Sequence, residues 1–383
     1  MDSLKRYLVI VMLFGFVSMF ADMTYEGARS ILPQYLGYLG ANLAVIGFLG
    51  GFGEFASYLL RFVSGLVSSK YGLLWTLTIS GYMLTGLSVA LIAIAPSWVY
   101  VALLTIMERI AKGLRTPPRD ALISIVAAKG RSGRAFGLHG AIDQVGAVLG
   151  PLIAAYMLAS YGFSPLTFVV LSVFSFIAVS ILIYTRSIYP RDVEVTPRKP
   201  VIGILRGPLT LYNLSISIPA LSSISLFVAI YWVGRSDPLI GVMYFIAIQV
   251  IEILMSIVLG ELYDKIGIRA IYIYYMIIPL TTLGLILNPL LLLIGVIFAI
   301  ENSIQKAVIG DLARGNEPLA YGYYHMVYGI ALAVGGYIVG LLAQQGLIDI
   351  LLALSLSLSI LGAMMMRVTI RITKAGGYSG EAV

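Results

Sequence analysis

Hydrophobic residues along the chain gather in long runs, and short polar or proline-containing stretches separate these runs. A helix needs about 20 apolar residues to cross the hydrocarbon core of a bilayer, and the runs are long enough to do so. Breaks such as Ala95-Pro96-Ser97 and Asp237-Pro238 end one helix before the next begins. The pattern predicts twelve transmembrane helices at roughly 6–36, 42–67, 74–94, 97–118, 134–158, 163–186, 207–231, 238–260, 268–288, 290–312, 318–343 and 347–368.

Composition favours an all-α integral membrane protein and excludes several other classes. Hydrophobic residues make up 60% and charged residues 11% of the 383 positions, whereas about 25% of residues are charged in soluble proteins. The absence of Cys excludes disulfides, thiolate metal sites and thiol catalysis, and two His argue against a multi-His metal site. The first run follows Lys5 and Arg6, is too long for the core of a secretory signal and has no small-residue cleavage site, so we expect it to remain as a helix.

Basic residues are distributed asymmetrically over the connections between the predicted helices. If the N-terminus is cytoplasmic, the outer connections hold one basic residue, Arg235. The inner connections and both ends hold Lys5, Arg6, Lys70, Arg115, Arg119, Lys129, Arg131, Arg134, Arg186, Arg191, Arg198, Lys199, Arg206, Lys265, Arg269, Lys306, Arg314, Arg367, Arg371 and Lys374. Because basic residues stay on the cytoplasmic side, this asymmetry predicts a multi-pass cell-membrane protein with both termini inside. Topology also explains the net charge of +7 better than nucleic-acid binding does.

The two halves of the chain look like repeats of one six-helix unit. Gly65-Leu-Val-Ser-Ser-Lys-Tyr-Gly72 follows the second predicted helix, and Gly260-Glu-Leu-Tyr-Asp-Lys-Ile-Gly267 follows the eighth. We therefore predict an N-terminal bundle over residues 1–186, a polar cytoplasmic linker over 187–206, and a C-terminal bundle with a short cytoplasmic tail over 207–383. Repeated bundles of this kind bind their substrate at the repeat interface near the middle of the membrane.

The repeated segments resemble the loop motif of the major facilitator superfamily, Gly-x-Leu-x-Asp-(Lys/Arg)-x-Gly-x-(Lys/Arg), and the resemblance covers the whole chain. The second-half copy matches at Gly260, Leu262, Asp264, Lys265, Gly267 and Arg269. The first-half copy matches at Gly65, Leu66, Lys70 and Gly72 but has Ser69 in place of Asp. In that family the Asp ties the loop to neighbouring helices during gating, so the resemblance implies a weak latch in the first half.

Two further motifs are similar to those of transporters in this superfamily. Arg109, Lys112 and Gly113 match the Arg-x-x-(Gln/Lys)-Gly motif of proton-coupled members. Gly146, Gly150 and Pro151 match the helix-packing motif of antiporters, Gly-x-x-x-Gly-Pro, without its trailing Gly pair. The segments 113–120 and 137–139 are similar to a branch of prokaryotic drug or metabolite exporters. The resemblance implies the major facilitator fold, with twelve helices in two pseudo-symmetric six-helix bundles, and secondary transport.

Ionisable residues within the predicted helices avoid every third helix. The third, sixth, ninth and twelfth helices have none in their interiors. Because ionisable groups in a membrane face protein or water, these four helices are predicted to lie on the lipid side of the others. The embedded ionisable residues are Asp22, Glu26, Arg29, Glu54, Arg61, Glu108, Arg109, His139, Asp143, Glu252, Glu301 and His325.

Five of these residues are candidates for proton coupling: Asp22, Glu26, Glu54, Glu108 and Arg109. Acids outnumber bases in the first-half cluster, which predicts a carboxyl without a basic partner. Burial favours the neutral carboxyl and a nearby Arg favours the ionised one, so a carboxyl between the two can carry a proton. We expect Asp22 to pair with Arg109 when it is ionised. Glu26 could be the carrier instead, and a purely structural Glu108–Arg109 pair is the plainer alternative.

A second set of residues is predicted to line the substrate cavity: Arg29, Asp143, Asn213, Glu252, Glu301 and Tyr328. Glu252 and Glu301 have no basic residue at the same predicted depth, so they are either cavity acids or neutral acids bonded between helices. The seventh helix carries Asn213 and several Ser but no charge, and Pro219 interrupts its backbone hydrogen bonds. These features favour a bendable, cavity-lining helix. Tyr328 belongs to a Tyr-rich run for which ordinary packing is an equal alternative.

Three Gly-x-x-x-Gly pairs mark places where helices can approach closely. They are Gly47 with Gly51, Gly146 with Gly150, and Gly336 with Gly340. We expect contacts between the two halves of the chain rather than a dimer interface, and therefore a monomer.

Three functions are compatible with these observations. The leading one is proton-coupled export of a small organic compound by alternating access, in which the halves rock about a central site. The alternative is a symporter or uniporter for a nutrient, lipid or metal complex, and the third is a transport-fold sensor. Enzymatic activity, a cofactor and ATP drive have no supporting motif. The expected partners are the substrate, protons and the lipid bilayer.

Overall fold

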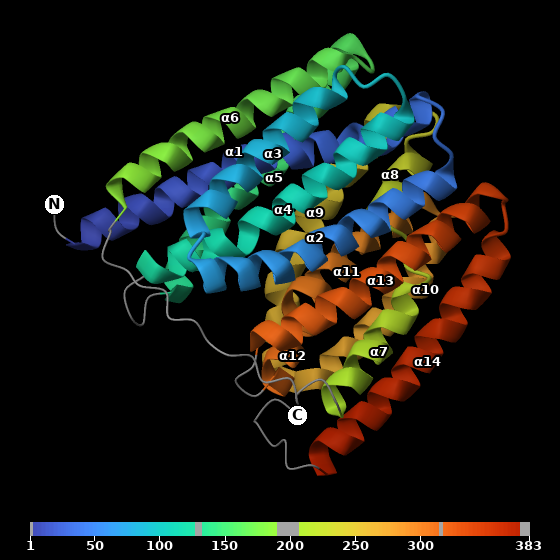
Figure 1. Cartoon of the computed structure of the whole chain (residues 1–383). Helices are drawn as coiled ribbons and strands as arrows, with labels where there is room; N and C mark the ends of the chain where they lie inside the picture. The colour runs from blue at the N-terminus through green and yellow to red at the C-terminus, as the bar shows by residue number, and fades with distance from the viewer. Residues whose placement is uncertain (1–2, 127–131, 190–206, 314–316, 376–383) are drawn as a thin grey trace. The chain divides into compact units, whose positions relative to one another are not determined.

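The computed structural model describes residues 3–126, 132–189, 207–313 and 317–375, and these residues form helices without a β-strand (Figure 1). The all-α prediction is therefore confirmed. The predicted linker at 187–206 and the end of the tail fall almost wholly outside the described residues. The elements are α1 (Ser3–Tyr38), α2 (Leu43–Tyr71), α3 (Leu74–Ile92), α4 (Trp98–Val126), α5 (Ser132–Tyr161), α6 (Pro165–Ile188), α7 (Pro208–Ala220), α8 (Leu226–Val233), α9 (Pro238–Ile266), η2 (Gly267–Ile271), α10 (Tyr272–Leu283), η3 (Asn288–Leu293), α11 (Ile294–Ile300), η4 (Glu301–Gln305), α12 (Lys306–Ala313), α13 (Glu317–Gln344) and α14 (Ile348–Ala375).

Most of the predicted segments are apolar enough to span a bilayer. Nine stretches among the described residues meet that standard of length and hydropathy, and one of them, Pro238–Leu283, contains both α9 and α10. The stretches do not include α4 or α7. Six ionisable residues, at positions 108, 109, 112, 115, 119 and 120, lower the hydropathy of α4, and α7 is only 13 residues long. All twelve predicted segments nevertheless correspond to helical structure.

The seventh predicted segment is broken, as its proline indicated. Helix α7 ends one residue after Pro219, and α8 begins at Leu226. Ser225 caps α8, because its hydroxyl accepts the Val228 N–H at 3.2 Å. The predicted interruption of this helix is confirmed.

Helix α4 continues eight residues beyond its predicted end at 118. Pro117 and Pro118 lie at that predicted end and cannot donate backbone hydrogen bonds. In the structure the carbonyl of Gly113, which would accept from residue 117, instead accepts the Ser64 hydroxyl at 2.9 Å. A side chain from α2 thus satisfies a group that the proline leaves open, and the predicted helix end is wrong.

The described residues divide into two compact units. The first comprises Met1–Leu39 and Leu59–Arg198, and the second comprises Gly40–Tyr58 and Lys199–Val383. The first part of α2, residues 43–58, therefore belongs to the second unit, whereas the predicted bundles place all of α2 in the first. The bundle boundary at 187–206 stays a prediction.

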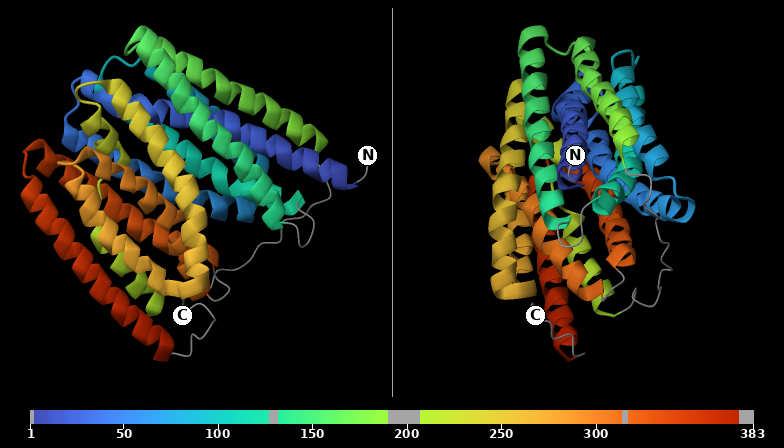
Figure 2. Two further views of the ribbon diagram at one scale, coloured as in Figure 1. Left: turned by 180° about the vertical axis from the view of Figure 1, so that it is seen from behind. Right: turned by 90° about the vertical axis from the view of Figure 1, so that its left-hand side faces the viewer.

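In the first unit, α1 packs along α5 and α6, and α3 packs along α4 and α6 (Figures 1 and 2). The α1–α5 contact is close because Gly146 and Gly150 lack side chains. A Cβ on either would meet a backbone oxygen of α1, from Met19 or Met23. The expectation that this Gly pair joins the two halves of the chain is therefore wrong.

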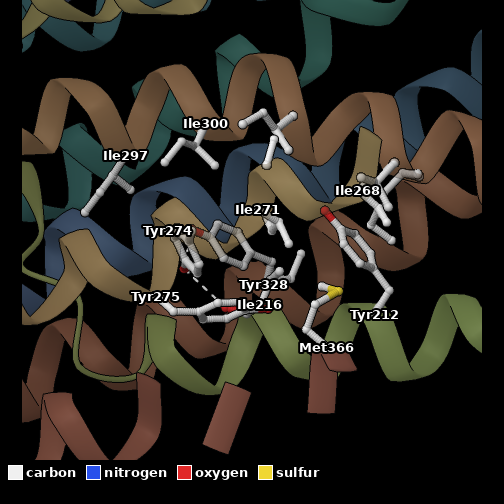
Figure 3. Close-up of a cluster of buried hydrophobic side chains, with 14 of the residues drawn as sticks. Tyr212, Ile216, Ile268, Ile271, Tyr274, Tyr275, Ile297, Ile300, Tyr328 and Met366 are labelled. Carbon is white, nitrogen blue, oxygen red and sulfur yellow. Dashed lines mark hydrogen bonds between the residues drawn. The ribbon is translucent and has the colours of Figure 1, made fainter. Parts of the chain in front are cut away.

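In the second unit, α7 packs against α13 and α14, and α9 packs against α11. Tyr212, Ile216, Tyr274, Tyr328 and Met366 meet in its largest buried cluster (Figure 3). The first part of α2 belongs to this unit, and its glycines contact α13. A Cβ on Gly47 would meet the Gly336 oxygen of α13, and one on Gly51 would meet the Leu332 oxygen. For these Gly pairs, the predicted contact between sequence halves is confirmed.

Candidate functional site

Two carboxyls from different helices meet in the first unit. Asp22 on α1 is 9% exposed, and its carboxyl and that of Asp143 on α5 act electrostatically on each other. The close α1–α5 packing at Gly146 and Gly150 brings these carboxyls together. Two carboxylates that share a buried site repel each other, and one proton on the pair removes that repulsion. The pair is therefore a place where one proton can be held or released.

Three cations of α4 surround a tyrosine of α1 beside this pair. The Tyr25 ring centre lies 4.9 Å from the Arg109 guanidinium carbon, 4.0 Å from Lys112 Nζ and 5.5 Å from the Arg115 guanidinium carbon. Lys112 also donates a hydrogen bond to the Tyr25 hydroxyl and lies 4.0 Å from Glu26 Oε1. Cations are attracted to the face of an aromatic ring. Tyr25 was not predicted as a site residue, because an isolated Tyr in an apolar helix is usually a packing residue.

The expected excess of acids over bases left out two bases of α4. Besides Arg29, Arg61 and Arg109, the helices that carry Asp22, Glu26, Glu108 and Asp143 in the first unit include Lys112 and Arg115. Arg115 is 2% exposed, and it donates to Thr85 and stacks 4.7 Å from the Tyr82 ring centre. The sequence placed Arg115 at a helix end because α4 was expected to stop at 118. Glu54, one of the five proton-coupling candidates, lies in the part of α2 that belongs to the second unit.

The ion pairs differ from the expected Asp22–Arg109 switch. Arg109 Nε donates to Glu108 Oε2 at 2.7 Å, and Arg29 lies 3.7 Å from Glu26. Asp143 is the charged group that acts most strongly on Asp22, and Lys112 is the cation that acts most strongly on it. The structure therefore brings Asp22, Glu26 and Asp143 together with Lys112. The assignment of coupling roles to these residues stays a prediction.

A second hydrogen-bonded group lies one helical turn from the Asp22–Asp143 pair. Ser18 precedes Asp22 by four residues, and His139 precedes Asp143 by four, so the two pairs are stacked along α1 and α5. The Ser18 hydroxyl is 2.9 Å from His139 Nε2 and 3.1 Å from the Tyr82 hydroxyl, and it accepts from Arg119 Nη1 at 3.0 Å. The repeated spacing of four was the only sequence signal for this group.

In the second unit, Glu301 opens η4, a short π-helical segment between α11 and α12. Such segments often occur at functional sites. The Tyr328 hydroxyl donates to Glu301, and the Tyr274 hydroxyl lies 3.1 Å from that of Tyr328. Figure 3 shows Tyr328 and Tyr274 side by side. The structure therefore joins two of the predicted cavity residues, Glu301 and Tyr328, directly.

Glu252 and Glu301 also have a basic neighbour, which corrects the expectation that they lack one. Asn302 donates to Glu252 Oε1 at 2.6 Å, and Lys306 donates to Asn302 Oδ1 at 2.7 Å. Lys306 also acts electrostatically on Glu301. The sequence assigned Lys306 to an inner connection, but it begins α12 directly after the π-helical segment.

Asn213 on α7 is fully buried, and its amide oxygen and nitrogen have no hydrogen-bond partner among the described residues. The Gln305 amide nitrogen likewise has none there, although Gln305 Oε1 accepts from Tyr324 at 2.6 Å. Buried amides are usually hydrogen-bonded. Asn213 therefore remains a candidate for contact with a polar ligand. Within the described ranges, no three His, Cys, Asp or Glu side chains form a group that could hold a metal ion.

The two copies of the loop motif share a backbone requirement. Gly72 follows α2 with φ +67°, and Gly267 follows α9 with φ +61°, a conformation that favours glycine. Lys70 lies 5.1 Å from the Tyr71 ring centre. Asp264, Lys265 and Arg269 are exposed, and the Tyr263 hydroxyl donates to Asp311 of α12. Gly65 and Gly260 lie in the helices that precede these turns.

Comparison with known proteins decides the family. The model of the Major Facilitator Superfamily matches residues 12–314. The chain belongs to this superfamily. It is 32% identical over 381 residues to an uncharacterized protein of Mycobacterium tuberculosis, covering 93% of this chain and 91% of the relative. It is 28% identical to an uncharacterized MFS-type transporter of Methanocaldococcus jannaschii, covering 87% and 88%.

Two further comparisons agree with the fold. The chain is 25% identical to the fosmidomycin resistance protein of Escherichia coli K12, covering 89% of this chain and 88% of the relative. A crystal structure of the nucleoside transporter NupG matches with a TM-score of 0.76 at 13% identity, covering 93% and 99% of the two chains. The superfamily prediction and its twelve-helix fold are confirmed. The protein is thus a multi-pass membrane protein of a secondary transport family, and its family and fold are those of transporters rather than enzymes.

Proposed function

We propose that this member of the superfamily is a proton-coupled exporter, which exchanges protons for a small organic compound across the cell membrane. The observation that carries the proposal is that the Asp22 and Asp143 carboxyls meet where α1 packs closely on α5. Two carboxyls that share a proton in a buried site form a group whose charge changes when that proton leaves. Such a change of charge can be coupled to substrate binding.

The cations of α4 near the pair would respond to this change of charge. When the shared proton leaves, two like charges face each other, and the nearby Lys112 and Arg115 act on both. Lys112 is also within 4.0 Å of Glu26 and bonded to Tyr25, so its position connects the acid pair to the α4 cations. Each pKa unit by which the carboxyl pair differs between two conformations corresponds to about 1.4 kcal/mol. Two or three such units would support useful coupling.

We propose that the proton reaches the pair past the hydrogen-bonded group of Ser18 and His139. Ser18 and His139 lie one turn nearer to the start of α1 and α5, which the asymmetry of basic residues assigns to the cytoplasmic side. We include in the proposal that both termini are cytoplasmic and that this route opens toward the cytoplasm.

Five of the residues predicted from the sequence are proposed to contact the compound. They are Asn213, Glu252, Glu301 and Tyr328 in the second unit and Arg29 in the first. Asn213 supports this role because its buried amide has no partner among the described residues. The loop-motif residues from Gly65 to Gly72 and from Gly260 to Arg269 are proposed to act in gating, and the transporter is proposed to act as a monomer.

Two relatives support export as the direction of transport. The fosmidomycin resistance protein is similar over most of the chain. The multidrug resistance protein MdtH of Photorhabdus laumondii is 30% identical over 33% of this chain. Resistance conferred by a transporter is naturally explained by removal of the compound from the cell, and we propose the same direction here.

A proteoliposome assay tests the proposal. The purified chain is reconstituted with an internal pH dye and an imposed pH gradient, and a panel of small organic compounds that includes fosmidomycin is screened. A compound that moves against proton flow supports antiport. Movement of protons and compound in the same direction would indicate a symporter, and gradient-independent transport would indicate a uniporter. Either result would overturn the proposed coupling mode.

A further inference from the structure

An apolar groove lies between the first part of α2, residues 43–58, and α13 within the second unit. Its volume is about 570 Å³. Its walls are Phe48, Phe52 and Phe55 from α2, and Ile330, Val334 and Tyr337 from α13. The groove exists because Gly47 and Gly51 bring the two backbones into contact while the large side chains beside them stand apart.

The walls of the groove are ordered by contacts between aromatic rings. The ring centres of Phe48 and Phe52 are 5.0 Å apart, and those of Phe52 and Phe55 are 5.8 Å apart. A Cβ on Gly329 of α13 would meet Phe55. One wall of the groove is therefore a continuous row of aromatic rings in contact with one another and with α13.

The groove faces the hydrocarbon of the membrane. Both helices lie in stretches that are long and apolar enough to span a bilayer. Phe48, Ile330, Val334 and Tyr337 are exposed in the isolated chain. Helical residues are about 100° apart, so Glu54 lies about 200° around α2 from Phe52. The acidic side of α2 is thus opposite the groove, as expected if the groove side meets lipid.

The dimensions of the groove fit one acyl chain. From Val45 to Phe55 it follows α2 for ten residues, or about 15 Å at the usual helical rise. That length is half of the hydrocarbon core of about 30 Å, and therefore the depth of one leaflet.

We propose that this groove is a binding site for an acyl chain of a membrane phospholipid. Tyr337 lies at the end of the groove nearest the α13 terminus, where a Tyr hydroxyl can reach the head-group region. Because both helices form the walls, a bound chain favours the conformation in which α2 packs on α13. The proposal rests on the membrane-spanning helices and the groove, and does not depend on proton-coupled export.

Photolabelling tests the site. The full chain is placed in liposomes containing a small fraction of phosphatidylcholine with a diazirine midway along one acyl chain. After illumination, labelled peptides are mapped by mass spectrometry. We expect label on the groove segments 45–55 and 330–337 to exceed that on the other exposed apolar faces. When unlabelled lipid is added before illumination, we expect the groove to keep its label longer than those faces do.

Two variants separate a specific site from ordinary lipid contact. Val334→Trp fills the groove from its exposed rim and should remove the label there. Leu356→Trp, at an exposed position on α14, makes a similar change elsewhere and should leave it in place. Uniform labelling of all exposed faces, rapid loss on dilution, or label that Val334→Trp does not change would overturn the proposal. So would cross-linking of two protein chains through the groove. If Val334→Trp fails to fold, the dilution measurement on the unmodified chain decides.

Discussion

Asp22 and Asp143 are far apart in the sequence, and only the packing of α1 on α5 brings their carboxyls together. Both residues stand out in the sequence as embedded acids, with Asp22 predicted to act in proton coupling and Asp143 to line the substrate cavity. Asp22 was expected to pair with Arg109, whereas in the structure Arg109 pairs with Glu108. A carboxyl in an apolar helix can be recognised as costly from sequence, but its partner depends on which helix lies beside it.

We expect Asp22→Asn and Asp143→Asn each to abolish transport driven by a pH gradient and to leave substrate exchange without a gradient intact. The amide of Asn can still donate to the remaining carboxyl, so the contact survives, but the two carboxyls that hold one proton between them are lost. Both transport modes are measured in proteoliposomes. Asp349→Asn, at an exposed position in the first turn of α14, is the matched control and should be neutral. Full gradient-driven transport in both site variants would place the coupling group elsewhere.

At the level of single elements, α4 shows how a neighbouring helix can override a local signal. Pro117 and Pro118 predict a helix end by every local rule, yet the helix continues to Val126 because Ser64 bonds the Gly113 carbonyl. In α7, by contrast, the helix ends just after Pro219. The extension of α4 is functionally relevant because it moves Lys112 and Arg115 from a helix end into the middle of a helix.

Removing the Ser64 hydroxyl should destabilise α4, and removing the proline should compensate. Ser64→Ala leaves the buried Gly113 carbonyl unpaired, at an expected cost of about 1–3 kcal/mol. In the double variant Ser64→Ala with Pro117→Ala, the new backbone N–H of residue 117 can bond that carbonyl, so stability should recover. Thermal unfolding of the purified variants measures both effects. Equal loss of stability in the single and double variants would show that this hydrogen bond does not support α4.

Two glycines on α5 provide a test of the α1–α5 contact. A Cβ on Gly146 would meet the Met19 carbonyl, so Gly146→Ala should force the helices apart and cost about 1–3 kcal/mol. Gly140 on the same helix has open space around the corresponding position. Gly140→Ala should therefore be neutral, or stabilising by about 0.5–1 kcal/mol as expected for a helix interior. Unfolding temperatures that change equally in the two variants would contradict the assigned contact.

On the scale of the whole molecule, α2 is the element that the two units share. Its residues up to Tyr58 belong to the second unit, and those from Leu59 onward belong to the first. If the units move as rigid bodies during transport, α2 must bend or its glycine contact with α13 must be released. The lipid groove beside that contact would then favour one of the two conformations.

Spin-label distances can follow this motion, and the chain has no Cys to interfere with labelling. A pair at Ser97 of the first unit and Asp349 of the second should change distance when pH or substrate changes. Asn42 and Asp349 both belong to the second unit, so their distance should change only if α2 leaves α13. A single unchanged Ser97–Asp349 distribution under all conditions, in a preparation shown to transport, would contradict movement of the units.

The amino-acid sequence by itself determined the membrane class, the positions of the twelve helical segments and the interruption at Pro219. These features follow from the local run of apolar residues and from local backbone chemistry, which are legible without knowing neighbours in space. The loop motifs belong to the same category, and the last glycine of each copy, Gly72 or Gly267, adopts a positive φ.

The tertiary structure alone decided which embedded groups meet. The Asp22–Asp143 pair, the three cations around Tyr25 and the bond between Ser64 and Gly113 each join different helices. Glycine pairs announced close packing, but only the structure showed that Gly146 meets α1 and that Gly47 meets α13. The physical reason is that helices of similar hydropathy can pack in many ways. The choice among them depends on shape and on hydrogen bonds between residues that are distant in the chain.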